Sequence, residues 1–225
     1  MSKFISVALD GPSGAGKSTA AKNLAKKLGY VYVDTGAIYR TVGLAAQYAE
    51  VDSKDTAGVI ALLPGIQIDM DYDADGTQMM LLNGKNVSRE IRTPRSSIYA
   101  SDVSAIPEVR AFLMDMQRDM AKKHSVVMDG RDIGTVIMPD ADVKIFMTTS
   151  PEVRAERRCM ELAEKGIECR YEEVLADIIQ RDKNDSEREI APAVPAEDAI
   201  HFDNRYSMEE TLEKLLEIIR EKTAE

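Results

Sequence analysis

The chain has 225 residues, of which 44% are hydrophobic and 30% are charged, a mixture that excludes a disordered chain and is sufficient for a full core. Its 29 Lys and Arg against 39 Asp and Glu give a formal net charge of −10, so its overall field repels DNA, RNA and anionic membranes. An anionic ligand therefore needs a local site of Arg, Lys and backbone N–H groups.

Short β-branched segments alternate with longer amphipathic ones, which is typical of βα units around a parallel sheet. The five segments that predict core strands are short and apolar, and they cover residues 4–10, 30–34, 125–129, 143–148 and 199–203. Most of them end at Asp or Thr. Ligands of open α/β sheets bind beyond the carboxyl ends of the strands, so these polar ends are expected to face a site.

The stretch between the second and third predicted strands, residues 35–123, is far longer than a crossover helix requires and indicates an insertion. Turns at Asp75-Gly76 and Asn83-Gly84 predict a small antiparallel sheet, over residues 66–71, 77–82 and 85–87. Helices are expected on either side, over residues 36–49 and 107–122.

After the fourth strand, Ser150-Pro151 predicts the start of a helix that runs towards Lys165, and a second helix is expected over residues 171–189. The prolines of residues 191–195 end that helix. The predicted final helix has an apolar stripe at helical spacing, formed by Leu212, Leu215, Leu216 and Ile219.

The two cysteines, Cys159 and Cys169, form neither a CxxC motif nor a four-ligand zinc set, and we expect reduced thiols. The apolar start, residues 1–9, is interrupted by Asp10, and no run approaches the roughly 18 apolar residues of a membrane span. We therefore expect a cytoplasmic monomer with no membrane or nucleic-acid partner.

The strongest motif is Gly-Pro-Ser-Gly-Ala-Gly-Lys-Ser, which fits G-x-x-x-x-G-K-[ST] in full between a predicted strand and an apolar-periodic helix. Its glycines let successive N–H groups point inward, where the helix N-terminus adds positive partial charge for a triphosphate. Lys17 is predicted to bridge the β and γ phosphates, and Ser18 to bind Mg²⁺. The residues predicted to bind ATP are Gly11, Pro12, Ser13, Gly14, Ala15, Gly16, Lys17, Ser18 and Thr19.

A P-loop alone does not separate a kinase from a GTPase switch or a mechanical ATPase. The sequence contains no Asn/Thr-Lys-x-Asp element for guanine recognition. Residues 73–76 match the short D-x-x-G pattern of GTPase switches, but they fall on a predicted hairpin and are interpreted as a turn. The residues that could bind a phosphoryl acceptor must therefore distinguish a kinase from a switch or a mechanical ATPase.

Candidate residues for binding the phosphoryl acceptor lie at the ends of two predicted strands. The second strand leads into a helix with Thr35 as its expected N-cap and Arg40 on the following turn, where it can hold a phosphate. The third ends in Asp129-Gly130-Arg131-Asp132. We assign Asp129 to Mg²⁺-bound water, Arg131 to the acceptor phosphate and Asp132 to an amino group, the alternative being an incidental surface cluster.

Both helices after the fourth strand carry arginines at helical spacing. On the first, Arg154 and Arg158 are four apart and Arg157 is adjacent, an arrangement suited to a closing lid. On the second, three residues at i, i+4 and i+7 line one stripe, namely Arg181, Asp185 and Arg188. The alternative for this stripe is ion pairing within the helix on a solvated face.

Over nearly the whole chain these motifs closely resemble the bacterial cytidylate kinases, which are nucleoside monophosphate kinases of the P-loop group. The motifs that carry the resemblance are residues 10–17, 34–40, 90–93, 129–132 and 181–188. It implies ATP-dependent phosphorylation of CMP and dCMP to their diphosphates by direct in-line transfer, with ATP and Mg²⁺ as cofactors.

The resemblance implies an α/β/α fold with a five-stranded parallel sheet, an inserted monophosphate-binding region containing the small antiparallel sheet, and a short helical lid. The expected divisions are a core of residues 1–38, 99–150 and 171–225, an insertion of residues 39–98 and a lid of residues 151–170.

The resemblance also implies the roles of individual residues. The acceptor phosphate is assigned to Arg40 and Arg131 with Arg188 close by, and the sugar to Arg181 and Asp185. The base is assigned to Thr35, Ser101, Arg110 and Asp132. The predicted catalytic residues are Lys17, Asp129, Arg131, Arg154 and Arg158, with Arg157 on ATP and with Ser18 and Asp129 at the metal.

Two alternatives remain at this point. Another small-molecule P-loop kinase, acting on UMP, AMP or a non-nucleotide such as shikimate, would use the same P-loop and lid chemistry. A nucleotide-dependent switch that signals by shape change is the alternative from another class.

Overall fold

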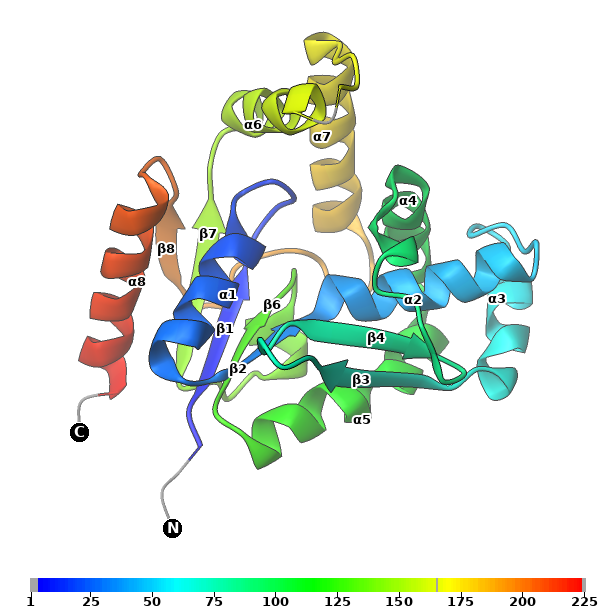
Figure 1. Cartoon of the computed structure of the whole chain (residues 1–225), viewed down its shortest axis with the longest axis horizontal. Helices are drawn as coiled ribbons and strands as arrows, with labels where there is room; N and C mark the ends of the chain where they lie inside the picture. Colours follow the sequence, from blue (N-terminus) through cyan, green and yellow to red (C-terminus); the bar gives the residue numbers. More distant parts are fainter. Residues whose placement is uncertain (1–3, 165, 224–225) are drawn as a thin grey trace.

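A five-stranded parallel sheet forms the centre of the computed structural model, which describes residues 4–164 and 166–223. Its strand order is β2-β6-β1-β7-β8 (Figure 1), and all neighbouring strands are parallel. The strands are β1 Ser6–Asp10, β2 Val31–Asp34, β6 Val126–Asp129, β7 Val143–Thr148 and β8 Ile200–Asp203. The five predicted core strands are thus confirmed, with small differences at their first residues.

The register of the sheet brings three strand ends together. Asp34 of β2 and Leu9 of β1 both lie opposite Asp129 of β6, and Asp10 lies opposite Phe146 of β7. The polar residues that end the strands therefore share one edge, where the loops that follow them meet.

Helices cover both faces of the sheet, because each strand is apolar on both sides. In β1, Val7 and Leu9 pack with α1 and α8, whereas Ala8 packs with α2 and α5 on the opposite face. These helices are α1 Lys17–Leu28, α2 Thr35–Tyr48, α5 Pro107–Lys123 and α8 Met208–Thr223.

The insertion contains the predicted antiparallel sheet, with order β3-β4-β5, formed by Ile68–Tyr72, Gln78–Leu82 and Lys85–Asn86. Residues 73–76 form the turn between β3 and β4, as interpreted, with Gly76 N donating to Asp73 O at 2.9 Å. Two α-helices of the described residues were not predicted, α3 Thr56–Leu62 and α4 Pro94–Val103. Each buries only a few side chains, so neither has the apolar stripe that makes a helix visible in sequence.

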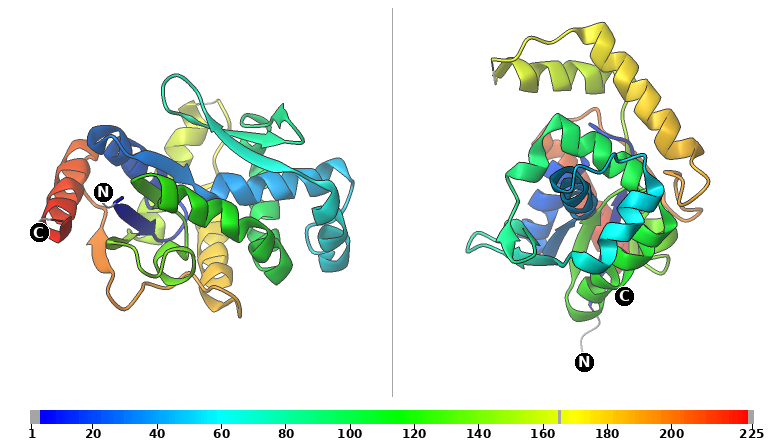
Figure 2. Two further views of the ribbon diagram at one scale, coloured as in Figure 1. Left: turned by 90° about the horizontal axis from the view of Figure 1, so that it is seen from below. Right: turned by 90° about the vertical axis from the view of Figure 1, so that its right-hand side faces the viewer.

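Helices α6 Pro151–Glu164 and α7 Tyr171–Glu187 form an arm that stands apart from the sheet layers (Figure 2). Lys165, where the first helix was expected to end, lies outside the described residues. The expectation of reduced thiols is wrong, because a disulfide joins Cys159 to Cys169. The Cα atoms of Cys159 and Cys169 lie 5.3 Å apart, a proximity that spacing alone does not reveal.

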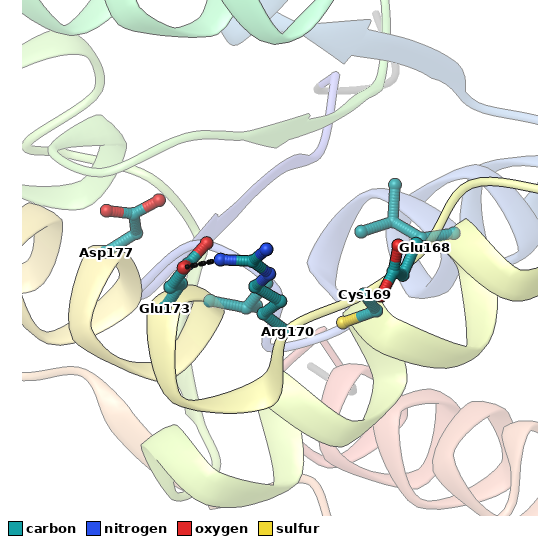
Figure 3. A pocket seen from close by; sticks show the side chains of 7 residues that line it. Glu168, Cys169, Arg170, Glu173 and Asp177 are labelled. Carbon is teal, nitrogen blue, oxygen red and sulfur yellow. Dashed lines mark hydrogen bonds and ion pairs between the residues drawn. The ribbon is translucent and has the colours of Figure 1, made fainter.

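A small pocket lies between the ends of α6 and α7, beside Cys169 (Figure 3). Arg170 and Glu173 form an ion pair there, with Arg170 Nη1 3.0 Å from Glu173 Oε1. None of the residues that line this pocket is a predicted site residue. Over the described ranges, the structure has no helix that is long and apolar enough to cross a membrane.

Candidate active site

The P-loop runs from the end of β1 to the start of α1, and glycine is required at two of its positions. A Cβ on Gly11, which has φ +142°, would lie 1.9 Å from the carbonyl oxygen of Met147 in β7. Gly16, with φ +91°, is the N-cap of α1, and a Cβ there would lie 2.5 Å from Asn204 Nδ2. Because Gly16 provides no side-chain cap, the first N–H groups of α1 are left for an anionic ligand.

Lys17 is buried inside the P-loop, where its Nζ donates a 2.7 Å hydrogen bond to the carbonyl oxygen of Pro12. Burial and the nearby positive charge of Arg131 lower the pKa of Lys17 to about 7. These surroundings disfavour the ammonium of Lys17, and an entering polyphosphate would restore it by charge pairing.

Asp129, at the end of β6, connects the P-loop to the second strand. Its Oδ2 accepts a 2.7 Å hydrogen bond from Ser18 Oγ, and its Oδ1 accepts a 2.9 Å bond from Tyr32 OH. Burial, reinforced by the negative charge of Asp34, raises the pKa of Asp129 to about 6. Tyr32 was not predicted, although its position two residues before the polar end of β2 places it beside that edge.

Ser18 and Asp129 provide two hard oxygen donors at adjacent positions, a set that fits Mg²⁺, which keeps several waters and needs few protein ligands. Over the described residues there is no group of three or more His, Cys, Asp or Glu side chains that could hold a metal ion. Two oxygen donors suit a cation that takes its remaining ligands from water and phosphate.

The junction between β2 and α2 differs from the prediction, because Asp34 and not Thr35 caps the helix. Asp34 Oδ1 accepts from Ala37 N at 2.8 Å, whereas Thr35 is the first helical residue. A carboxylate satisfies the N-terminal N–H better than a Thr that lies within the helix. The hydroxyl of Thr35 donates instead to the carbonyl oxygen of Asp129 at 2.8 Å.

Asp34 is also the shared partner of two arginines. Its Oδ2 lies 3.2 Å from Arg40 Nη2 and 2.8 Å from Nη2 of Arg92, which comes from the insertion. Burial alone would raise the pKa of Asp34, but the two guanidinium groups hold it below its ordinary value. The predicted phosphate ligand Arg40 is thus held at the strand edge by a residue whose pairing role was missed.

Asp132 pairs with two of the predicted substrate residues. It forms a buried ion pair with Arg110, and its Oδ1 lies 3.6 Å from Arg188 Nη2. The Arg110 guanidinium also lies 5.6 Å from the centre of the Tyr39 ring, within cation–π range. Three predicted substrate residues from separate parts of the sequence therefore meet in one cluster, together with Tyr39, which was not predicted.

Asp185 forms a second cluster around a carboxylate on α7. It accepts from Arg131 Nε at 3.1 Å and from Ser101 Oγ at 3.3 Å, and Arg181 Nε lies 4.0 Å away. Burial and nearby Arg131 lower the pKa of Arg181 to about 10. A solvated face does not describe this stripe, because Asp185 is only 7% exposed. Arg188 departs from the predicted helical stripe, since α7 ends at Glu187.

The lid arginines separate into two kinds. Arg154 Nη1 donates to Ser13 O of the P-loop and to Asp182, both at 3.0 Å, and Arg157 Nη2 donates to the carbonyl oxygen of Asn204 at 3.0 Å. Arg158 instead pairs with Glu161 one turn away on the exposed surface. The structure therefore places Arg154 and Arg157 beside the P-loop and leaves Arg158 outside these contacts.

Asn204 is a buried residue after β8 that the sequence analysis missed. Its Nδ2 donates to the carbonyl oxygen of Ala15 in the P-loop at 2.8 Å, and its Oδ1 accepts from Thr211 Oγ1 at 2.8 Å. The available signal was its position directly after the carboxyl end of a parallel strand, at the edge where the other site residues lie.

A P-loop beside buried arginine and carboxylate clusters defines a kinase of the P-loop class. In such a kinase the phosphates of the donor and of the acceptor both need cationic partners. The sequence model of the cytidylate kinase family matches residues 7–221. Similar proteins include the cytidylate kinases of Caldicellulosiruptor saccharolyticus, 50% identical, and Fervidobacterium nodosum, 49% identical, with 96% of both chains covered in each case. The chain belongs to the cytidylate kinase family.

Among solved structures, an uncharacterized protein from Eubacterium ventriosum is similar with a TM-score of 0.53 and 13% identity, over 97% of this chain and 99% of that one. This likeness concerns the fold alone. The predicted α/β fold with its parallel sheet and small antiparallel sheet is confirmed.

Proposed function

We propose that this chain transfers the γ-phosphoryl group of ATP to CMP and dCMP, giving the nucleoside diphosphates and ADP. The observation that carries this proposal is the continuity of residues 129–132. Asp129 bonds to Ser18 of the P-loop, and the Arg131 and Asp132 side chains that follow belong to the two buried clusters. Donor and acceptor sites would therefore adjoin at one strand end.

The acceptor roles follow from the chemistry of each cluster. The carboxylate of Asp132 is suited to accept from the exocyclic amino group of cytosine, with Arg110 as a donor to the ring acceptors and with Thr35 and Ser101 nearby. Uracil has a carbonyl in place of that amino group, so it would face a carboxylate with no proton between them. We therefore expect a preference for cytosine over uracil.

The phosphate and the sugar would occupy the arginine side of the site. We assign the phosphate to Arg40 and Arg131, with Arg188 close by, and the sugar hydroxyls to Arg181 and Asp185. These arginines are already paired with carboxylates in the structure. The pairs keep several guanidinium groups folded towards one region before the substrate arrives.

Catalysis in this site needs no general base, because a phosphate acceptor is ionised at pH 7. Two unit charges 4 Å apart repel by about 4 kcal/mol at an effective dielectric of 20, so cationic side chains must offset this cost. Lys17 and Arg131 would do so, together with Arg154 of the lid, which contacts the P-loop in the structure. Arg158 pairs with Glu161 on the surface, so it would take part only if the lid closes further. Ser18 and Asp129 would hold Mg²⁺, which neutralises phosphate charge when bound.

Water must be excluded during transfer, since it is a competing acceptor of the phosphoryl group. We propose that residues 151–170 act as the lid and residues 39–98 as the acceptor-binding region. Arg154 and Arg157 already connect α6 to the P-loop side of the site, which supports this role for the arm.

The test is a coupled assay of ADP release with CMP, dCMP, UMP, AMP and GMP as separate acceptors, with the diphosphate product identified. Rapid turnover with CMP and dCMP and slow turnover with the others is expected. Preference for AMP, UMP or a non-nucleotide acceptor would assign the chain to another substrate. ATP hydrolysis unaffected by every monophosphate, with no diphosphate product, would favour a nucleotide switch.

A further inference from the structure

Asp10 is a buried carboxylate that none of the roles above uses. It is the last residue of β1, directly before Gly11 of the P-loop, and it is only 5% exposed. Its Oδ1 accepts from the backbone N–H of Ile133 at 2.8 Å, and its Oδ2 accepts from that of Gly134 at 2.7 Å. One side chain thus binds two consecutive N–H groups from a distant part of the chain.

The two N–H groups belong to the start of a π-helical turn, η3 Ile133–Ile137. The first N–H groups of a helical turn have no partner within it, so they need an external acceptor. Ile133 and Gly134 are both buried, and water therefore cannot replace the carboxylate. Asp10 fixes the position of the main chain immediately after Asp132.

The other end of the same loop is held by the neighbouring residue of β1. Gly130 N donates to the carbonyl oxygen of Leu9 at 3.2 Å. A Cβ on Gly134 would lie 3.4 Å from Asp10 Oδ2, in ordinary van der Waals contact, so the loop lies against the carboxylate. Consecutive residues of one central strand therefore hold the loop on both sides of Arg131 and Asp132.

We propose that Asp10 is a positioning residue that holds the acceptor-side loop at a fixed place relative to the P-loop. This inference rests on the proposed function of Arg131 and Asp132. Asp10 belongs to the strand that leads into the P-loop, while its carboxylate holds the segment that carries the acceptor residues. It thereby links the position of the acceptor site to the position of the donor site.

A second reading gives Asp10 a role on the donor side, because Lys17 and Asp132 are the charged groups whose fields act on it. If the carboxylate served mainly to keep Lys17 charged, its loss would weaken ATP binding. If it positions the loop, its loss would weaken CMP binding. The two readings therefore differ in which substrate is affected.

The test uses Asp10→Asn and Asp10→Ala, with Asp142→Asn as a matched control. Asp142 Oδ2 also accepts from a backbone N–H and a second donor, Ser6 N and Ser6 Oγ, both at 2.9 Å, but at the opposite end of β1. KM for each substrate, kcat and the melting temperature are measured for each variant. Calorimetric titration of CMP without ATP gives a readout that does not depend on turnover.

The expected result is a rise of about tenfold in both KM and Kd for CMP in Asp10→Asn, which loses one charge-assisted acceptor, with KM for ATP changed less than about twofold. Asp10→Ala should show the larger effect on the same parameters. Asp142→Asn should lower the melting temperature and leave the ratio of the two KM values unchanged.

Three results would overturn the inference: an equal rise in both KM values, a rise for ATP alone, or an Asp10→Asn chain that no longer folds. The last would make Asp10 part of the scaffold only. Failure of the proposed function is recognised separately, since the wild-type chain would then not phosphorylate CMP at all.

Discussion

Ser18 and Asp129 are 111 positions apart in the sequence, yet Ser18 Oγ donates a 2.7 Å hydrogen bond to Asp129 Oδ2. The P-loop places Ser18 on the first turn of α1, and the register of the sheet places Asp129 at the adjacent strand end. We propose this pair as the binding place of a cation shared with the phosphates of ATP.

Replacing Ser18 with Ala is expected to raise the Mg²⁺ concentration that gives half-maximal activity, because one oxygen ligand is lost. Asp129→Asn should also lower kcat, on the order of 10²-fold, since it removes a negative charge opposite the cation. The measurement is initial rate against free Mg²⁺ at saturating CMP.

The matched control for this prediction is Ser53→Ala. Ser53 Oγ donates to Asp102 Oδ2 at 2.6 Å, in a Ser–Asp pair outside the proposed metal site. Its loss should leave the Mg²⁺ dependence as in the wild type. An unchanged Mg²⁺ dependence in both Ser18→Ala and Asp129→Asn would remove these residues from the metal site.

Lys17→Met is expected to lower kcat by about 10²-fold or more, the scale for one preorganised charge donor, without unfolding the chain. Loss of the side chain should also stabilise the nucleotide-free protein at pH 7. The desolvated ammonium opposes folding, whereas a buried Met side chain does not. A rise of a few degrees in melting temperature is expected, since about 1 kcal/mol corresponds to roughly 2–4 °C in a chain of this size.

The pH dependence of this effect has a defined sign. The pKa of Lys17 is about 7 in the folded chain against an ordinary value of 10.5, so between these values the unfolded chain binds more protons. The free energy of unfolding of the wild type therefore rises with pH across this window. The stability gained by deprotonating Lys17 is complete above pH 10.5 and is lost as pH falls to about 7. Lys17→Met should lack this rise.

Denaturant unfolding between pH 7 and pH 10 measures the difference. Lys26→Met is the control, because Lys26 is an exposed lysine of the same helix. It should unfold with the pH dependence of the wild type. Parallel curves for the wild type and Lys17→Met would contradict the unfavourable burial of the Lys17 ammonium within the P-loop.

Local sequence determined much of this architecture. The P-loop could be predicted because glycines at fixed offsets leave few backbone conformations, and the strand ends because apolar runs stop at Asp34 and Asp129. The helices α3 and α4 could not, because each buries only a few of its own side chains and so has no apolar stripe at helical spacing.

The partners of the charged residues depend on tertiary packing. Arg131 could be placed at a strand end from sequence, but its ion pair with Asp185 depends on how the last turns of α7 pack beside that strand end. Two further contacts depend on the detailed backbone geometry, which the residue types do not determine. They are the capping of α2 by Asp34 and the disulfide of Cys159 with Cys169. The sequence therefore indicated which charged residues belong to the site, but it did not indicate which residues they contact.

The buried ion pair of Arg110 and Asp132 leads us to expect that loss of Arg110 weakens the binding of CMP but not of ATP. Arg110→Met should raise KM for CMP by about 10- to 100-fold, the range for a hydrogen bond to a charged group, and leave KM for ATP nearly unchanged. It should also destabilise the chain by roughly 3 kcal/mol, at the lower end for a broken buried pair because Arg188 still faces Asp132. Steady-state kinetics and urea unfolding measure the two effects.

Lys122→Met, on the same helix as Arg110, is the control, since Lys122 pairs with Asp119 on the exposed surface. Both KM values should stay at those of the wild type. If Arg110→Met weakened ATP and CMP equally, Arg110 would belong to the scaffold rather than to the base site.

Loss of Asn204 is expected to have the opposite selectivity, weakening the binding of ATP rather than of CMP. Asn204→Ala removes the 2.8 Å bond to the carbonyl oxygen of Ala15 and leaves a buried P-loop acceptor without its donor. KM for ATP should rise about tenfold with KM for CMP nearly unchanged, opposite to the Asp10 variants. Thr211→Val removes only the hydroxyl that orients Asn204, so its effect should be in the same direction and smaller. A rise in KM for CMP in both variants would show that Asn204 does not act through the P-loop.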